Sequence, residues 1–358
     1  MCLPDLRGAV TTFFPKVRST TPGAFPLGSG AEPAPGYRLK RVRGRGGFAE
    51  VWEADSPTGP VALKFMLSSN AATTSRELRS VQSFQAMDHP YLVRTHAVFT
   101  VPGYIVTAME LGEATLLDLM FLYTDELRQP IPPAQLGLYL WQVGQALDFL
   151  NARRHLRDGR KVGFQHGDIK PNNVLLFGDV AKLTDYGVAT ATSGPTTPCP
   201  RHGTRDYAAP EVLQGYQTDH SDQFSLAVTY HVLRVGCFPF PPAPADDLPK
   251  AFSRGPADLS ALAPAERLAL ARALSPVPQD RYPSCEALTN QLLRALGFKA
   301  LVEQDRPVKI VPDDETLPDG TKSVLRSRLL TGTPSPSVTG GRPPGSAPGT
   351  RPGPRSTG

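Results

Sequence analysis

One eight-residue segment of the sequence, His166–Asn173, combines an acid, a cation and a carboxamide. In such a segment Asp168 can orient an attacking hydroxyl group and accept its proton, and Lys170 can steady the moving phosphoryl group. Asn173, five residues after the aspartate, can bind a metal ion. The apolar run that follows predicts a strand entered from a loop. This spacing indicates transfer of a phosphoryl group to a hydroxyl.

A glycine-rich segment lies upstream, between two strand-like runs at Tyr37–Val42 and Val51–Ala54. It contains Gly44, Gly46 and Gly47. Because glycine has no Cβ, the backbone of such a hairpin can approach phosphate oxygens and donate its amide hydrogens to them. The segment therefore predicts a phosphate-binding loop.

The next strand and the helix after it supply a pair of opposite charges. The alternating run Val61–Lys64 predicts a strand whose lysine points toward the phosphates. Within Ser75–Met87, Glu77 is the only acid, and apolar residues recur at three-residue steps on one helix face. These apolar residues are Leu78, Val81 and Phe84. We expect Glu77 to pair with Lys64 and hold it in place.

Further carboxylates follow the central segment. Asp185 ends a short apolar strand in Lys182–Gly187, and Mg²⁺ prefers hard oxygen ligands of this kind together with a carboxamide such as Asn173. Farther on, Glu211 in Ala-Pro-Glu needs a buried cation. Arg281 is the candidate for that cation.

In combination, the motifs from about Tyr37 to Phe298 resemble those of the eukaryotic-type, or Hanks-type, protein serine/threonine kinases. The resemblance implies an α+β, bilobal fold, with a small β-rich N-terminal lobe of five strands and one helix and a larger helical C-terminal lobe. It implies that Asp168 is the catalytic base, that Lys170 contacts the phosphoryl group, and that Asp222 anchors the catalytic loop. The small-lobe charges Lys64 and Glu77 would then position the nucleotide.

The same resemblance implies the remaining site residues, with ATP and Mg²⁺, or Mn²⁺, as cofactors. Asn173 and Asp185 would be the metal ligands. The residues expected to contact ATP are Gly44, Gly46, Gly47, Val51, Ala62, Lys64, Met109, Leu111, Leu175 and Asp185. Met109 and Leu111 would belong to a hinge at 109–112.

The expected acceptor is a serine or threonine hydroxyl of a protein substrate. Lys170 and Thr204 match the serine/threonine-specific pattern, and Thr204 is expected to touch Asp168 and Lys170 directly. Small-molecule kinases of related fold usually lack the Ala-Pro-Glu segment that is present here. The amino-acid sequence of the catalytic loop and the many prolines and arginines resemble those of bacterial members of the family.

Four positions depart from the family pattern. Gly167 replaces the arginine that commonly receives an activation-loop phosphate, and it should add backbone freedom beside the catalytic aspartate. Arg43 replaces an apolar residue over the adenine, which its stem could still cover while its head reaches solvent. Ala49 replaces the third glycine, and Glu77 lies thirteen residues before Pro90, about one helical turn more than usual. An alternative interpretation is therefore a pseudokinase that binds a nucleotide or a partner without catalysis.

The composition divides the chain into a catalytic unit and two flanks. Residues 1–36 are expected to form a flexible N-terminal extension, 37–298 the kinase domain and 299–330 a linker with no assigned fold. Residues 331–358 hold seven prolines and seven glycines with no acid, so they cannot bury enough apolar surface to offset the entropy of ordering. We expect this tail to be disordered.

Charge is concentrated outside the catalytic unit. The net charge is +5, yet residues 37–298 contain 26 Lys and Arg against 25 Asp and Glu. A nearly neutral domain with basic flanks is not the footprint of a nucleic-acid-binding protein, so no nucleic acid is expected. A module that binds RNA or a membrane through these flanks is a further alternative, and steep salt dependence would be its signature. The basic segment 153–161 predicts a solvated loop or a docking surface for an acidic partner.

The four cysteines are scattered, without a CxxC pair, which favours a reducing compartment. No apolar run approaches the roughly 18 residues of a membrane span, and no secretory signal is apparent, so a cytoplasmic location is expected. The best apolar stretch, Phe224–Phe240, predicts a buried helix instead. A second long helix is predicted over Leu136–Leu150 by apolar steps of three and four residues. The sequence gives no expectation for the oligomeric state.

Overall fold

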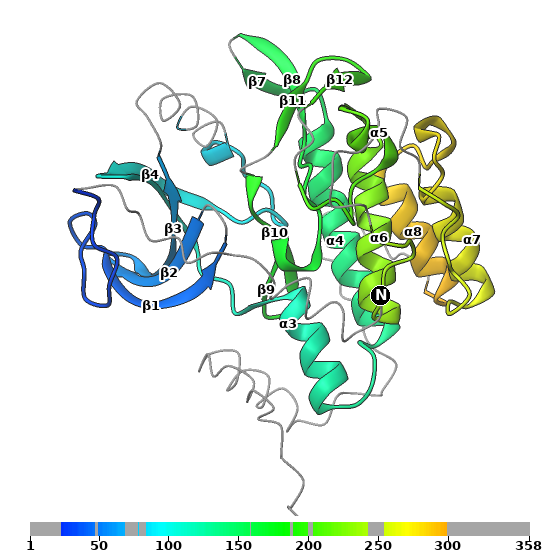
Figure 1. Cartoon of the computed structure of the whole chain (residues 1–358), viewed down its shortest axis with the longest axis horizontal. Coiled ribbons are helices and arrows are strands. Elements are labelled where there is room, and N and C mark those ends of the chain that lie inside the picture. Colours follow the sequence, from blue (N-terminus) through cyan, green and yellow to red (C-terminus); the bar gives the residue numbers. More distant parts are fainter. Residues whose placement is uncertain are drawn as a thin grey trace, which may run out of the picture.

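A computed structural model describes residues 23–46, 49–68, 78, 84–157, 159–186, 189–199, 203–242 and 254–298. Figure 1 shows a sheet lobe, in blue, beside a helical lobe coloured from green to orange. The two lobes meet where the backbone N–H of Val93 donates to Leu183 O and that of Leu183 donates to Tyr91 O, each at 2.9 Å. The bilobal α+β architecture agrees with the fold expected from the sequence.

The small lobe is built on one antiparallel sheet with the strand order β1-β2-β3-β5-β4. Along β3 alternate side chains take opposite faces, because a strand has a period of two. Val61, Leu63 and Phe65 enter the small-lobe core, whereas Ala62 and Lys64 lie on the other face and partly line the cleft between the lobes. The strands are β1 (Arg38–Arg45), β2 (Ala49–Ser56), β3 (Gly59–Leu67), β4 (Thr95–Val101) and β5 (Tyr104–Glu110).

The small lobe begins earlier than the sequence predicted. Phe25 and Leu27 pack against its core, and Phe25 N donates to Pro102 O at 2.8 Å. Leu39 N of β1 donates to Ala31 O at 2.9 Å. The expectation of a flexible extension up to residue 36 is therefore wrong for residues 23–36, whose apolar side chains cover an edge of the sheet. Residues 1–22 lie outside the described part of the chain.

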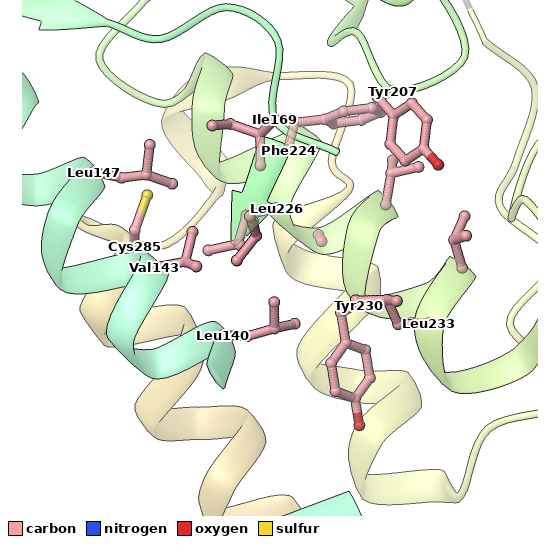
Figure 2. Packing of buried hydrophobic residues seen from close by; sticks show 14 of the residues in the cluster. Leu140, Val143, Leu147, Ile169, Tyr207, Phe224, Leu226, Tyr230, Leu233 and Cys285 are labelled. Atoms are coloured by element: carbon pink, nitrogen blue, oxygen red, sulfur yellow. The ribbon is translucent and has the colours of Figure 1, made fainter. Parts of the chain in front are cut away.

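The large lobe is organised around two long helices. In α4 (Pro133–Asn151) all five apolar residues that predicted the helix are buried. Figure 2 shows Leu140, Val143 and Leu147 of this helix facing Phe224 and Leu226. These last two belong to α6 (Ser221–Val235), which ends at Gly236 with φ of 80°. The helix predicted over Phe224–Phe240 is thus buried but stops five residues short, because glycine in the left-handed conformation closes it.

Shorter elements complete the large lobe. Two of its sheets have three strands and one has two. The strands are β6 (Ala114–Thr115), β9 (Val174–Phe177), β10 (Val180–Leu183), β11 (Thr190–Thr192), β12 (Thr196–Pro198) and β13 (Tyr216–Thr218). The helices are α3 (Leu116–Phe121), α5 (Pro210–Leu213), α7 (Pro264–Ala273) and α8 (Cys285–Ala295), with short turns at Leu122–Glu126, Pro171–Asn173 and Pro278–Asp280.

The basic segment 153–161 is not a loop but part of a β-hairpin. Strand β7 (His155–Arg157) pairs with β8 (Arg160–Gln165), and Gly159 forms the turn with φ of 74°. Strand β8 also pairs with β11, which belongs to the activation segment between Asp185 and Glu211. The hairpin and this segment therefore share one sheet, at the top of Figure 1. Leu156 in this hairpin is 75% exposed. The interpretation as a loop is wrong for His155–Arg157 and for residues 160–161, which pair with each other along the hairpin.

Within the described ranges, no helix combines the length and the apolar character that crossing a membrane requires.

Candidate active site

The loop that carries the catalytic candidates is anchored by a buried carboxylate. Asp222, in the first turn of α6, accepts the backbone N–H of His166 at 2.6 Å and that of Gly167 at 2.9 Å. Burial raises the pKa of Asp222, and His166 and the two N–H donors oppose that rise. Because both donors are backbone groups, this contact fixes the path of the chain into Asp168. The predicted anchoring role of Asp222 is confirmed.

The glycine before the catalytic aspartate is held in place. Gly167 has φ of 77°, a conformation that favours glycine, and its N–H is bound to Asp222. Its carbonyl oxygen faces Gly203 so closely that a Cβ built on Gly203 would lie 2.3 Å away. The backbone freedom expected at Gly167 is therefore not observed, because two neighbours restrain it.

Asp168 lies at the centre of a compact polar cluster. Its Oδ1 accepts hydrogen bonds from Thr204 N at 2.8 Å and Thr204 Oγ1 at 2.9 Å. Its Oδ2 lies 2.8 Å from Lys170 Nζ and 3.0 Å from Asn173 Nδ2. Lys170 Nζ also donates to Thr204 Oγ1 at 2.7 Å. The predicted contacts of Thr204 with Asp168 and Lys170 are confirmed.

This cluster keeps Asp168 ionised. Burial alone would raise the pKa of the carboxyl group, but the charge of Lys170 and the hydrogen bonds from Lys170 and Thr204 outweigh it. The net result is a pKa below the ordinary value of 3.8. An aspartate in this state can accept a hydrogen bond from a hydroxyl group and, at the transition state, its proton.

A test of this arrangement is the acid limb of the activity profile. Replacing Lys170 with methionine removes the cation while Asp168 stays buried, so the pKa of Asp168 should rise. A base must be ionised, and its rate contribution is lost as the pH falls through its pKa. We therefore expect the acid limb of kcat/KM of Lys170→Met to lie at higher pH than the acid limb of the wild type. Identical acid limbs in two proteins that circular dichroism shows folded would contradict the assigned cause.

The lysine of the small lobe faces the second metal candidate. Lys64 Nζ lies 2.5 Å from Asp185 Oδ1, so the two lobes are joined by an ion pair across the cleft. Asp185 has φ of 69°, which aims its side chain out of the strand that precedes it. This pair was not predicted from the sequence, which assigned Glu77 as the partner of Lys64. Glu77 lies outside the described residues, and its pairing remains a prediction.

Three aromatic rings lie together next to Asp185. Tyr186 stacks on Phe84 at 4.9 Å between ring centroids and 12° between ring planes. On its other side it contacts His166 at 5.7 Å. The hydroxyl of Tyr186 donates to Leu183 O at 2.7 Å. Sequence reasoning treated Phe84 only as a buried helix residue; the ring contacts link it to the metal candidate and the catalytic loop.

The residues assigned to an adenine slot come together as a separate apolar cluster between the two lobe cores. Ala62 and Met109 are buried in it, and Val51, Leu111 and Leu175 pack against them. Gly112 closes the wall, since a Cβ there would lie 3.0 Å from Leu175 Cβ. Gly44 lies near the end of β1, where it pairs with Val51 of β2, and Gly46 follows the strand directly, whereas Gly47 lies outside the described residues. The five apolar assignments are thus brought to one place.

Arg43 corrects one expectation about this slot. Its head is not free in solvent: Arg43 Nη2 donates to Glu113 O at 2.7 Å and, more weakly, to Gly112 O at 3.4 Å. The side chain is 19% exposed. The guanidinium turned inward because two backbone carbonyls at the end of β5 are within its reach.

The buried pair predicted for the large lobe is present. Arg281 Nη1 and Nη2 donate to the two carboxylate oxygens of Glu211 at 2.7 and 2.9 Å. Both side chains are almost fully buried. Glu211 follows directly on the segment that carries Thr204, so the pair fixes the end of the activation segment.

The donor chemistry suits a magnesium ion. Asn173 gives its amide N–H groups to Asp168 O and Oδ2, which turns its carbonyl oxygen toward other partners, and Asp185 contributes carboxylate oxygens. One carboxylate and one carboxamide are the hard ligands that Mg²⁺ takes when phosphates and waters complete its shell. Asn173 and Asp185 would hold such an ion, and Mn²⁺ accepts the same donors.

This fold and this site are those of a protein kinase. The family described as "Protein kinase domain" matches residues 37–295, and the chain belongs to that family.

Curated relatives include the serine/threonine-protein kinase PknH of Mycobacterium bovis, 30% identical over 318 residues, which cover 84% of this chain and 50% of PknH. CBL-interacting protein kinase 4 of Oryza sativa subsp. japonica is 34% identical over 259 residues, or 68% of this chain and 54% of that protein. Serine/threonine-protein kinase PknE of Mycobacterium tuberculosis is 29% identical over 341 residues, or 89% and 56%. The chain spans about half the length of the curated relatives it matches.

Proposed function

We propose that this protein is a protein serine/threonine kinase that transfers the γ-phosphoryl group of ATP to hydroxyl groups of protein substrates. The observation that carries the proposal is the cluster around Asp168, in which Thr204 and Lys170 hold the carboxylate ionised. Lys64 and Asp185 lie across the cleft from each other. Membership of the family and the names of the relatives support the same activity.

In the proposed reaction Asp168 orients the hydroxyl of the acceptor and takes its proton as the oxygen bonds to phosphorus. Lys170 lies beside that carboxylate and places a positive charge where the phosphoryl group passes. Lys64 binds nucleotide phosphates after leaving Asp185. Magnesium, when bound by Asn173 and Asp185, neutralises phosphate charge. The apolar slot takes the adenine.

The alternative from another class is a pseudokinase. It draws on Gly167, Arg43 and Ala49, but none of these removes a group of the cluster, and Gly167 is conformationally restrained. The described residues retain Lys64, Asp168, Asn173 and Asp185, and Thr184 N, next to Asp185, donates to Asn173 O at 3.0 Å. This retention supports catalysis.

The direct test is transfer of radiolabel from γ-labelled ATP by the purified chain, to itself and to a generic basic protein substrate, with the labelled residues identified by mass spectrometry. Magnesium-dependent label on serine or threonine supports the proposal. Label on tyrosine would contradict the acceptor class. Tight nucleotide binding without transfer to any protein would favour the pseudokinase.

The strand pairing of the activation segment suggests that kinase activity does not depend on phosphorylation of this segment. Thr190 and Thr192 belong to β11, which pairs with β8, and Thr196 and Thr197 belong to β12, which pairs with β13. These pairings order the segment through backbone hydrogen bonds. With Gly167 in place of arginine, a phosphate in the segment lacks its usual cation in the catalytic loop.

We therefore predict basal activity without phosphorylation of this segment. Replacing its hydroxyl residues together with alanine should change the rate by less than about tenfold, or ~1.4 kcal/mol of barrier. The residues to replace are Thr190, Thr192, Ser193, Thr196 and Thr197. Thr204 must stay, because it contacts Asp168 and Lys170. A collapse of the initial rate that acidic replacements restored would overturn this prediction. It would show that a cation other than the missing arginine binds the phosphate.

The finer assignments of location and partners are also proposals. Consumption of ATP and the free thiols of Cys199, Cys237 and Cys285 suit the cytoplasm. The expected partners are ATP and proteins with serine or threonine acceptors, not nucleic acid. The exposed basic hairpin β7–β8 remains a candidate docking surface for an acidic partner.

A further inference from the structure

One arginine links the two sides of the adenine slot. Arg43 directly precedes Gly44, so its backbone belongs to the glycine-rich wall of the slot. Its Nη2 reaches Glu113 O at 2.7 Å and Gly112 O at 3.4 Å. These carbonyls follow Leu111, which lines the opposite wall. The Arg43 side chain therefore connects two walls that must admit a nucleotide between them.

The far end of this connection is firmly placed. Gly112 packs against Leu175, the other apolar face of the slot, since a Cβ on Gly112 would meet Leu175 Cβ at 3.0 Å. Glu113 N donates to Leu176 O at 2.9 Å, which ties this segment to β9. Arg43 thus bonds to carbonyls that are tied to the large lobe, while its own strand β1 belongs to the sheet of the small lobe.

The guanidinium has little competing attraction within the small lobe. Its nearest carboxylate there is Glu53, with Nη1 3.6 Å from Oε2. That carboxylate oxygen is bonded more closely by Arg41, whose Nε lies at 2.9 Å. Burial lowers the pKa of Arg43, and Arg41 adds to that effect while Glu53 opposes it. The closest contact of the cation is therefore the carbonyl of Glu113, while the carboxylates of Glu53 and Asp118 attract it from farther away.

We propose that Arg43 is a strap across the nucleotide slot, which opens to admit the nucleotide and closes again over the bound adenine. The inference rests on the proposed function, because it requires that the slot bind ATP. Release of the Gly112 and Glu113 carbonyls precedes entry and exit alike, so the strap slows both. The planar, delocalised cation on the roof of the slot also suits the face of a purine.

The strap makes a kinetic prediction that a purely structural role would not make. Replacing Arg43 with leucine removes the hydrogen bonds to Gly112 and Glu113 and leaves an apolar residue over the slot. We expect the association and dissociation rate constants for nucleotide both to rise about tenfold, since in the wild type the hydrogen bonds from a charged donor to Gly112 O and Glu113 O must break on the way in and out. The dissociation constant should change much less.

The experiment is stopped-flow fluorescence of N-methylanthraniloyl-ADP with magnesium and the full chain. The matched control is Glu53→Gln, which removes the carboxylate charge next to Arg43 and leaves the carbonyls of Gly112 and Glu113 in place, so its rates should stay near wild type. Arg43→Lys should fall between wild type and Arg43→Leu, because lysine donates from a point rather than a fork. Thermal melts of each variant verify folding.

The possible outcomes distinguish a failure of the strap proposal from a failure of the proposed kinase activity. Equal rate constants in wild type and folded Arg43→Leu would overturn the strap and leave the proposed kinase activity standing. A rise in Glu53→Gln equal to that in Arg43→Leu would also overturn it, because the effect would then come from the ion pair with Glu53 and not from the carbonyls. Failure of all the proteins to bind the probe would overturn the proposed function and the strap together, and the radiolabel assay would identify this case independently.

Discussion

Replacing Asp168 with asparagine is expected to lower phosphoryl transfer by roughly 10²- to 10⁴-fold while nucleotide affinity stays nearly unchanged. Asparagine has the same shape, so its carbonyl oxygen can still accept the hydrogen bonds from Thr204. It cannot take a proton from an acceptor hydroxyl, and it gives Lys170 no negative charge to pair with. Initial rates with a peptide substrate, beside nucleotide binding by fluorescence, measure the two effects separately.

Asp185 provides the contrast that makes the assignment specific. Asp185→Asn removes a metal ligand and the partner of Lys64, so it should weaken magnesium-dependent nucleotide binding as well as the rate. If Asp168→Asn lost nucleotide affinity as strongly as Asp185→Asn, the role of Asp168 as a base would be wrong. If Asp185→Asn kept the magnesium dependence of the wild type, its role as a ligand would be wrong.

The sequence predicted best where short spacing leaves the chain few choices. Asp168 and Asn173 are five residues apart in one loop, and the side chain of the second reaches both the carbonyl and the carboxylate of the first. The strand of Lys64 and the helix α4 follow from periodicity, because a buried face repeats every two residues in one and at three and four in the other. The family motifs then linked these local elements into a cleft.

Contacts between distant segments were harder to predict. Lys64 and Asp185 are 121 positions apart, and nothing in either neighbourhood indicates that they meet. Phe84 matched the helix pattern, but its partner Tyr186 is set by how the lobes pack. Arg43 was expected to point to water, since its sequence neighbours do not reveal the carbonyls of Gly112 and Glu113.

Two errors have a common physical cause. Segment 23–36 and the hairpin at 153–161 are rich in proline, glycine or charge, and such composition usually indicates a loop. Each is ordered by backbone pairing with another segment: Leu39 N binds Ala31 O, and β7 pairs with β8. Backbone hydrogen bonds do not depend on side-chain type, so composition alone underestimates them.

The largest effect on stability is expected at the buried pair of the large lobe. Arg281 donates to both oxygens of Glu211, and its remaining donors reach His220 O at 3.0 Å and Ser275 O at 2.9 Å. Its guanidinium also lies 5.0 Å from the ring centroid of Phe224. Removing one partner of a buried pair leaves an uncompensated charge and costs about 3–5 kcal/mol. Arg281→Ala should therefore lower the free energy of unfolding by that amount and the melting temperature by roughly 10 °C.

A matched control separates burial from charge. Arg153 makes an equally short pair with Asp219, at 2.7 Å, but its side chain is 38% exposed. Arg153→Ala should cost less than about 1 kcal/mol, because water replaces the lost partner and screens the remaining charge. Equal losses in the two variants would show that burial does not set the cost.

The activity of Arg281→Ala should fall together with its stability, since Glu211 follows the segment that holds Thr204 against Asp168. A variant that melts like wild type yet is inactive would give Arg281 a catalytic role instead.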